Sequence, residues 1–132
     1  MIVVDASAVI DVLVPERADP TLTERLRGDG NLHAPHLVDV EVTHVLRRLV
    51  ASGELSSDRA SDARVDAAEL RIQRYPHRPL LERAWELRNY LSVYDAVYVA
   101  LAELLEAPLV TCDARLARAS GHTAAIELFS SS

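Results

Sequence analysis

Two aspartates stand at the ends of short apolar runs. Asp5 comes directly after residues 2–4, and Asp113 lies just beyond residues 109–111. Both runs are rich in β-branched residues and predict short buried strands. In open parallel sheets, ligands bind at the carboxyl ends of the strands, so both side chains are candidates for a site. For either aspartate alone, a turn or helix-cap role explains its position equally well.

Two further acids lie on helical stripes that are otherwise apolar. Glu41 comes three residues after Val38 and four before Val45, and Asp95 shares a helical face with Tyr98. An acid that faces a core is costly unless it is paired, protonated or bound to metal. For Glu41, a salt bridge to an arginine or a position at the edge of the stripe is the alternative. For Asp95, the alternative is capping or dipole stabilisation in a first helical turn.

Together, Asp5, Glu41, Asp95 and Asp113 are expected to converge on one edge of the sheet. Like charges ~4 Å apart cost on the order of 4 kcal/mol at an effective dielectric near 20, so such a cluster would protonate or capture a cation. Oxygen ligands suit Mg²⁺ or Mn²⁺. One or two such ions can activate water and hold a phosphodiester for in-line attack, without a histidine or lysine base.

The elements that would position these acids alternate along the chain. The patterns predict strands over residues 2–4, 32–34, 72–75, 109–111 and 125–128. They predict helices over residues 7–13, 20–27, 36–51, 56–71, 79–90, 95–105 and 114–119, with Ser7 as the cap of the first and Pro15 after its end. Short apolar strands alternating with helices indicate an α/β fold, a parallel sheet of four to five strands with helices on both faces.

Composition limits the function classes. The 132 residues, 49% of them hydrophobic, suit one domain over residues 1–129, followed by a flexible tail at 130–132. The net charge of −6 argues against a protein that holds nucleic acid by an overall positive field, although bound cations can reverse the local sign. All fourteen basic residues are arginine, which excludes Schiff-base and phosphate-loop lysines. No leader or apolar stretch of ~18 residues is present, so we expect a cytoplasmic protein without a membrane segment.

The order of these motifs resembles that of the PIN-domain ribonucleases, and in particular the VapC toxins of type II toxin–antitoxin pairs. Residues 2–8 look like the family's opening motif, and residues 38–46 look like its glutamate helix. Residues 94–103, followed by 108–113 and 115–117, are similar to its carboxyl-terminal signature. The likeness spans essentially the whole chain, and its carboxyl-terminal block is the most specific part.

The resemblance implies a three-layer sandwich whose metal-binding and catalytic acids are Asp5, Glu41, Asp95 and Asp113. It implies Mg²⁺-dependent RNA cleavage, with Mn²⁺ as a substitute, homodimers, and inhibition by a cognate VapB-like antitoxin. Ser7 matches the family's hydroxyl residue, which holds a metal-bound water or a carboxylate. Some relatives carry a further acid shortly after the fourth one. Here Arg115 and Leu116 follow Asp113, which leaves one or two metals open.

Other chemistry-bearing residues have plainer explanations. Asp11 is one turn beyond Ser7, but a solvated or supporting role suits it better. Cys112 lacks a disulfide partner and fits a small core residue. A series of five arginines could bind RNA phosphates or an acidic partner, or could form a solvated helical face: Arg71, Arg74, Arg78, Arg83 and Arg88. Arg47 and Arg48 leave the same alternatives open.

Three other functions compete with the nuclease. Asp5-Ala6-Ser7 lacks the second aspartate of haloacid-dehalogenase-type phosphatases, and the absence of lysine also counts against receiver domains. A metal-dependent adhesion module would need a hydroxyl residue at position 9, where this chain has Val9. An inactive PIN-like module that only binds RNA or a partner remains the third alternative, although all four acids are present.

Overall fold

Five short parallel strands form the centre of the molecule. The computed structural model describes residues 1–14, 16 and 19–129. The strand order is β3-β2-β1-β4-β5, and every neighbouring pair is parallel. The strands are β1 (Ile2–Val4), β2 (Leu32–Pro35), β3 (Ile72–Tyr75), β4 (Leu109–Thr111) and β5 (Ile126–Leu128). The predicted parallel α/β sheet is therefore confirmed, with the fully buried β1 in the middle.

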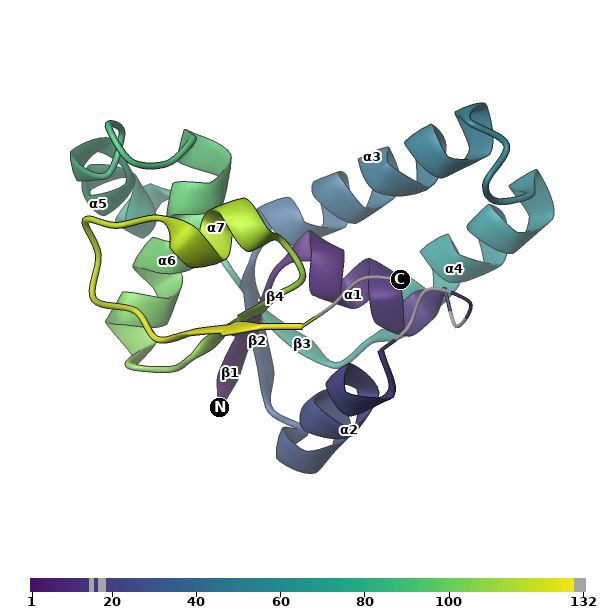
Figure 1. The fold of residues 1–132 in the computed structure, drawn as a ribbon, viewed down its shortest axis with the longest axis horizontal. Helices are drawn as coiled ribbons and strands as arrows, with labels where there is room; N and C mark the ends of the chain where they lie inside the picture. Colours follow the sequence, from purple (N-terminus) through teal and green to yellow (C-terminus); the bar gives the residue numbers. More distant parts are fainter. Residues whose placement is uncertain (15, 17–18, 130–132) are drawn as a thin grey trace.

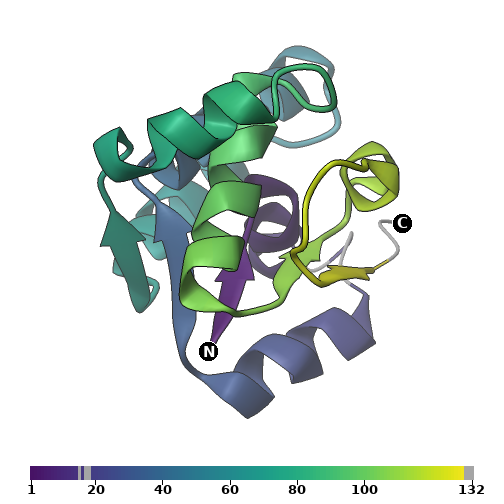
Figure 2. The ribbon, with the colours of Figure 1, turned by 90° about the vertical axis from the view of Figure 1, so that its left-hand side faces the viewer.

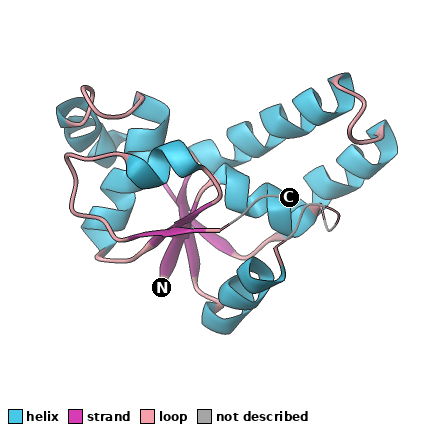
Figure 3. Cartoon of the chain, viewed as in Figure 1, coloured by secondary structure: helices cyan, strands magenta, loops and turns pink. Residues whose placement is uncertain are grey.

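Helices cover both faces of this sheet, as Figure 3 shows. In the described residues they are α1 (Ala6–Leu13), α2 (Pro20–Asp29), α3 (Leu37–Ala51), α4 (Ser57–Glu69), a 3₁₀ turn η1 (Arg78–Leu80), α5 (Leu81–Glu86), α6 (Val93–Leu105) and α7 (Ala114–Arg118). Helices α5 and α6 lie on one side, and α1 to α4 lie on the other (Figures 1 and 3). Helix α6 packs directly on β1 and β2, and every residue from Ala96 to Ala102 is buried. Its nearly uniform apolar sequence is explained by this central position.

The parallel arrangement decides where the chain can carry a site. All five strands run in the same direction, so the loops that follow β1, β2 and β4 emerge at one edge of the sheet. Helices α1, α3 and α7 begin at that edge. Figure 2 shows the N-terminus at the opposite end of β1. The carboxyl edge therefore gathers residues that are more than a hundred positions apart in sequence.

Three sequence predictions about helix ends differ from the structure. Asp5, not Ser7, caps α1, because the Asp5 carboxylate accepts the Ala8 amide while Ser7 already lies in the first turn. The predicted helix over 79–90 begins as a 3₁₀ turn and ends at Glu86. Helix α6 starts two residues earlier than predicted, because Ser92 accepts the Asp95 amide and caps it. The predictions for Pro15 and for the tail at 130–132 lie outside the described residues.

The loop between α7 and β5 depends on Gly121. Its φ of +88° is a conformation that favours glycine, and a Cβ added there would lie 2.5–2.8 Å from ring atoms of Tyr90. The Gly121 carbonyl also accepts a hydrogen bond from Arg83 of α5. This loop is therefore fitted closely against the turn that connects α5 and α6.

We predict that Gly121→Ala lowers the free energy of unfolding by about 2 kcal/mol, because it adds a steric conflict to the backbone strain. The matched control is Gly53→Ala, where φ is +80° and no atom lies within 4 Å of the added Cβ. That variant should lose only about 1 kcal/mol. Urea unfolding of both variants measures the difference. Equal losses would mean that the Tyr90 ring swings away without cost.

Candidate active site

The four predicted acids line one cavity of about 250 Å³ at the carboxyl edge of the sheet. Asp5 follows β1 and caps α1, while Asp113 follows β4 and caps α7. Glu41 lies in the second turn of α3, and Asp95 lies in the first turn of α6. The cap roles considered for Asp5 and Asp113 are thus real, and they coexist with a place in the cavity wall.

Asp5 is the most deeply buried of the four. One carboxylate oxygen, Oδ1, accepts the Ser7 hydroxyl at 2.6 Å and the Ala8 amide at 3.1 Å, and Oδ2 accepts the Thr111 hydroxyl. Burial raises the pKa of Asp5 to about 6 despite these hydrogen bonds, and the charge of Asp113 raises it further. Both oxygens are therefore held in fixed positions by neutral donors that leave the net charge uncompensated.

The same two hydroxyls join β1 to the loop after β4. Ser7 Oγ accepts the Cys112 amide at 2.9 Å, and Thr111 Oγ1 accepts the Asp113 amide at 2.9 Å. Of the two roles considered for Ser7, the structure shows the contact with a carboxylate. Thr111 was missed by the sequence analysis, although a hydroxyl residue two positions before Asp113 was a usable signal.

Glu41 is held by a tyrosine that sequence reasoning also missed. The hydroxyl of buried Tyr98 donates to Glu41 Oε1 at 2.6 Å. Burial raises the pKa of Glu41, the Tyr98 hydrogen bond opposes that shift, and the charge of Asp95 adds to it. Among the described residues, no arginine forms an ion pair with Glu41. The salt-bridge alternative for Glu41 is thus wrong for the described part of the chain.

Asp95 completes the acidic wall without being the helix cap. Burial raises the pKa of Asp95, and the charge of Asp113 raises it further. The amide of Asp95 donates to Ser92, and the nearby charge of Arg115 partly offsets the burial. Three of the four acids therefore resist ionisation in the absence of an added cation, first because of burial and further because of the neighbouring carboxylates.

The donor set fits a hard divalent cation held largely through its own water. Within the described residues, no three acidic, histidine or cysteine side chains form a ready-made ligand cluster. The four carboxylates instead surround a shared cavity. Mg²⁺ prefers oxygen ligands, keeps several waters and commonly uses only one or two carboxylates directly. Oxygen donors with raised pKa values around such a space suit Mg²⁺ or Mn²⁺ better than zinc, which favours nitrogen and sulfur.

Comparison with known proteins identifies the family. A family model described as "PIN domain" matches residues 2–122, which is most of the chain. This chain belongs to the PIN-domain family. It is 47% identical over 128 residues to Ribonuclease VapC1 of Mycobacterium tuberculosis, covering 96% of each chain. It is 42% identical over 128 residues to Ribonuclease VapC12 of the same organism, covering 97% of this chain and 98% of the relative. The predicted VapC resemblance is confirmed.

Solved PIN-domain structures share the fold at lower sequence identity. VapC20 of Mycobacterium tuberculosis, described as a sarcin-ricin loop cleaving toxin, aligns with a TM-score of 0.69 and 19% identity, covering 93% of this chain and 97% of that one. A toxin–antitoxin complex from Klebsiella pneumoniae aligns with a TM-score of 0.64 and 16% identity, covering 89% and 91%. At these identities the likeness supports the fold alone.

The arginine series predicted from sequence does not form one surface of this PIN-domain chain. Arg74 makes a two-pronged ion pair with Asp39, and Arg83 makes one with Glu103 of α6. Arg88 lies 4.4 Å from the centroid of the Trp85 ring. The remaining two, Arg71 and Arg78, are exposed on separate segments. Three of the five arginines therefore make contacts within the protein. The series forms neither a continuous RNA-binding surface nor a fully solvated helical face.

Asp11 and Cys112 support the structure beneath the acids. Asp11 is buried, so the predicted solvated role is wrong, and its carboxyl group interacts with the Cys112 thiol. Burial and the Asp11 contact raise the pKa of Cys112 to about 12. A thiol with so high a pKa is a poor nucleophile, in agreement with the predicted packing role.

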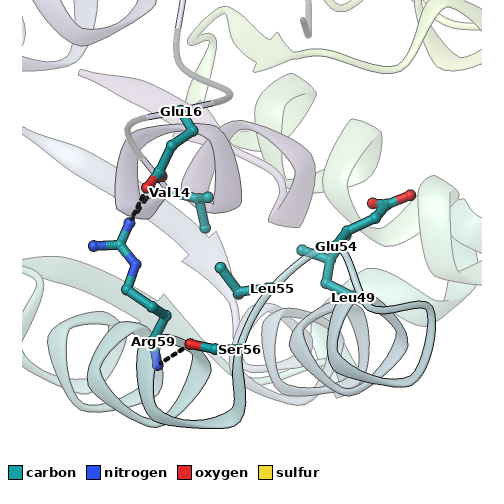
Figure 4. A pocket seen from close by; sticks show the side chains of 7 residues that line it. All are labelled: Val14, Glu16, Leu49, Glu54, Leu55, Ser56 and Arg59. Atoms are coloured by element: carbon teal, nitrogen blue, oxygen red, sulfur yellow. Dashed lines mark hydrogen bonds and ion pairs between the residues drawn. The ribbon is translucent and has the colours of Figure 1, made fainter.

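A larger cavity of about 400 Å³ lies between α1, α3 and α4 and is separate from the acids. Figure 4 shows Val14, Leu49 and Leu55 around its interior, with Arg59 paired to Glu16 at 2.6 Å. Its lining includes two glutamates and a serine, but Glu16 is paired with Arg59 and the four acids of the carboxyl edge are not part of it. Size alone would select this cavity, but the chemistry of the lining selects the acidic one.

We predict that the stability of the metal-free protein falls as pH rises from about 4.5 to about 7. The folded-state pKa of Asp5, about 6, exceeds its usual 3.8, so in this range the folded state binds more protons than the unfolded state. A difference of about two pKa units corresponds to about 3 kcal/mol. Glu103 has a lowered pKa of about 2, so its opposite effect lies below this range. Urea unfolding in EDTA should show that wild type loses stability relative to Asp5→Asn as pH rises. A difference in unfolding free energy between the two proteins that stays constant with pH would contradict the assignment.

We predict that Tyr98→Phe weakens Mn²⁺ binding about tenfold while the fold is retained, because Glu41 loses the donor that fixes Oε1. Isothermal titration of Mn²⁺ into each protein gives the affinity. The matched control is Tyr75→Phe, which removes a hydroxyl hydrogen-bonded to His33 at 2.6 Å, outside the acidic cavity. An unchanged Mn²⁺ affinity in a folded Tyr98→Phe protein would show that Glu41 needs no such support.

Proposed function

We propose that this chain is a metal-dependent endoribonuclease that acts as the toxin of a type II toxin–antitoxin pair. The observation that carries the proposal is the convergence of Asp5, Glu41, Asp95 and Asp113 on one cavity. The chain's relatives named Ribonuclease VapC, similar over nearly the full length of both proteins, support the reaction class. The competing phosphatase, receiver and adhesion functions lack comparable support.

Mg²⁺, with Mn²⁺ as a substitute, would be held by the four carboxylates. When bound, such an ion supplies Lewis-acid polarisation of a phosphodiester and lowers the pKa of water. The protein's own contribution is preorganisation of the carboxylates. Ser7 and Thr111 fix both oxygens of Asp5, and Tyr98 fixes one oxygen of Glu41. Carboxylates fixed in this way would hold the ion in place without rearrangement as charge develops on the phosphate, and such preorganisation is a usual source of electrostatic catalysis.

The proton balance of the site also suits hydrolysis. Tyr98 keeps its proton, because burial and the neighbouring Glu41 raise the pKa of Tyr98. Tyr98 is therefore a permanent hydrogen-bond donor to Glu41 and not a base. Glu41 Oε2 has no hydrogen bond to the described residues, so this oxygen is available to accept a proton from water. A raised pKa brings a carboxylate closer to the range in which it works as a general base.

An inactive PIN-like module that binds RNA or a partner is the second candidate. It would need the same fold but would not need hydroxyl donors aligned on the acids. The supports of Asp5 and Glu41 favour an active site.

We predict discrete, metal-dependent cuts in total cellular RNA, and loss of about a hundredfold or more in rate for Asp95→Asn. End mapping in Mg²⁺ or Mn²⁺, with EDTA as the metal-free control, measures both. The matched control is Asp62→Asn, which makes the same change at an exposed position on α4. Full cleavage by a folded Asp95→Asn protein would remove Asp95 from the site. Metal binding without any cleavage would favour the inactive module.

An antitoxin polypeptide is the proposed partner, supported by the toxin–antitoxin complex among the similar folds. Co-expression with a candidate antitoxin should relieve growth inhibition, and growth that stays inhibited would argue against that partner.

We also propose a homodimer. Five large apolar residues are exposed between positions 81 and 94, the densest such group in the described chain: Leu81, Trp85, Tyr90, Val93 and Tyr94. Light scattering at micromolar concentration tests this, and a monomeric mass would refute it. Within the described residues, no helix is long and apolar enough to cross a membrane.

A further inference from the structure

The acidic cavity has a second wall that the four acids do not account for. His44, Val45 and Arg48 line it together with Glu41. They follow Glu41 by three, four and seven residues along α3, so they lie on the same face of the helix. The cavity therefore extends along this face of α3 from Glu41 to Arg48, which is exposed to solvent.

Arg48 forms no ion pair with the described residues. Four arginines in the described part of the chain meet side-chain carboxylates within 4.0 Å, namely Arg25, Arg59, Arg74 and Arg83. Arg48 is not among them, although it lines a cavity that contains four acids. Its guanidinium group is therefore available to an anion from solution.

Arg115 supplies a second cation from the other flank. It belongs to α7, and its charge lowers the pKa of Asp95, so the guanidinium acts on the acidic site. Its side chain makes no ion pair within 4.0 Å among residues 1–14, 16 and 19–129. Helix α3 follows β2 and α7 follows β4, while Asp5 follows β1 between these strands. Arg48 and Arg115 therefore flank the acids.

Two free guanidinium groups beside a cluster of carboxylates match a polyanion whose cleaved bond lies at the acids. Guanidinium binds phosphate with two parallel hydrogen bonds, and such charge-assisted contacts are strong. They would offset locally the repulsion that a chain of net charge −6 exerts on a nucleic acid. A cavity of about 250 Å³ can receive part of a single strand.

We propose that Arg48 and Arg115 bind the phosphates of single-stranded RNA on the two sides of the bond that is cut. This inference rests on the proposed nuclease function and assigns its substrate track. The RNA strand would run across the carboxyl edge of the sheet from the α3 side to the α7 side. Arg48 and Arg115 bind phosphate in this arrangement and are not ligands of the metal.

The test compares Arg48→Gln and Arg115→Gln with Arg71→Gln, which removes the same charge from an exposed residue just before β3, at the opposite edge of the sheet. Binding of a short fluorescein-labelled single-stranded RNA of mixed sequence is followed by anisotropy over a range of NaCl concentrations. An Asp95→Asn background prevents cleavage. Each cavity variant should lose about tenfold in affinity and reduce the slope of log K against log salt by about 0.7. Arg71→Gln should match its parent.

A second readout uses the active protein. Arg48→Gln and Arg115→Gln should raise KM for RNA cleavage with little change in kcat, and neither change should weaken Mn²⁺ binding. Unchanged RNA affinity and salt slope in both variants would overturn the inference even if wild type cleaves RNA, and the nuclease function would then stand alone. An equal loss in Arg71→Gln would also overturn it. RNA binding that depends on both arginines, in a wild-type protein that never cleaves, would support the track and refute the nuclease.

Discussion

The gathering of four carboxylates around one partly buried cavity is the constraint on which the rest of the site depends. The fold brings Asp5, Glu41, Asp95 and Asp113 to one cavity, and burial holds the pKa of three of them above the ordinary range. Within the described residues, no ion pair relieves the repulsion among these acids. Neutral hydroxyl groups hold Asp5 and Glu41 and fix their geometry without cancelling charge. The unrelieved charge is what would attract a divalent cation.

The hydroxyl groups also explain how the site stays rigid at so small a size. Thr111 binds Asp5 through its hydroxyl while the same oxygen receives the Asp113 amide. Ser7 makes the corresponding contacts with Asp5 and the Cys112 amide. Two neighbouring strand ends are therefore tied through one carboxylate. The helix caps add to this, because Asp5 and Asp113 each hold the N-terminus of a helix whose partial positive charge favours an anion there.

The distribution of arginines complements this acidic centre. Arg25 and Arg83 reach carboxylates on β5 and α6, and Arg74 reaches Asp39 on α3. These pairs tie helices and strands together away from the acids. A chain with as many acids as this one can still present positive charge where a phosphate would arrive, because its cations are divided between structural pairs and the borders of the cavity.

Much of the fold and the acidic set could be predicted from the sequence. Short β-branched runs before Asp5 and Asp113 identify strand ends, and the apolar stripe around Glu41 identifies a helix face, because periodicity in an α/β chain reports burial directly. The near-continuous apolar stretch after Asp95 likewise indicated a central helix, which α6 is. Local patterns of this kind are sufficient because they depend only on residues a few positions apart.

Only the tertiary structure decided which neighbours serve the acids. Tyr98 reads as a core aromatic in the sequence, and its hydroxyl finds Glu41 only because α6 and α3 meet at the sheet edge, 57 residues apart in the chain. Thr111 and Asp5 are 106 residues apart and meet because β4 pairs with β1. The arginines between positions 71 and 88 show the opposite case, because residues close together in sequence make contacts in different parts of the fold. Strand order sets these distances, and strand order is a property of long-range packing that no local pattern contains.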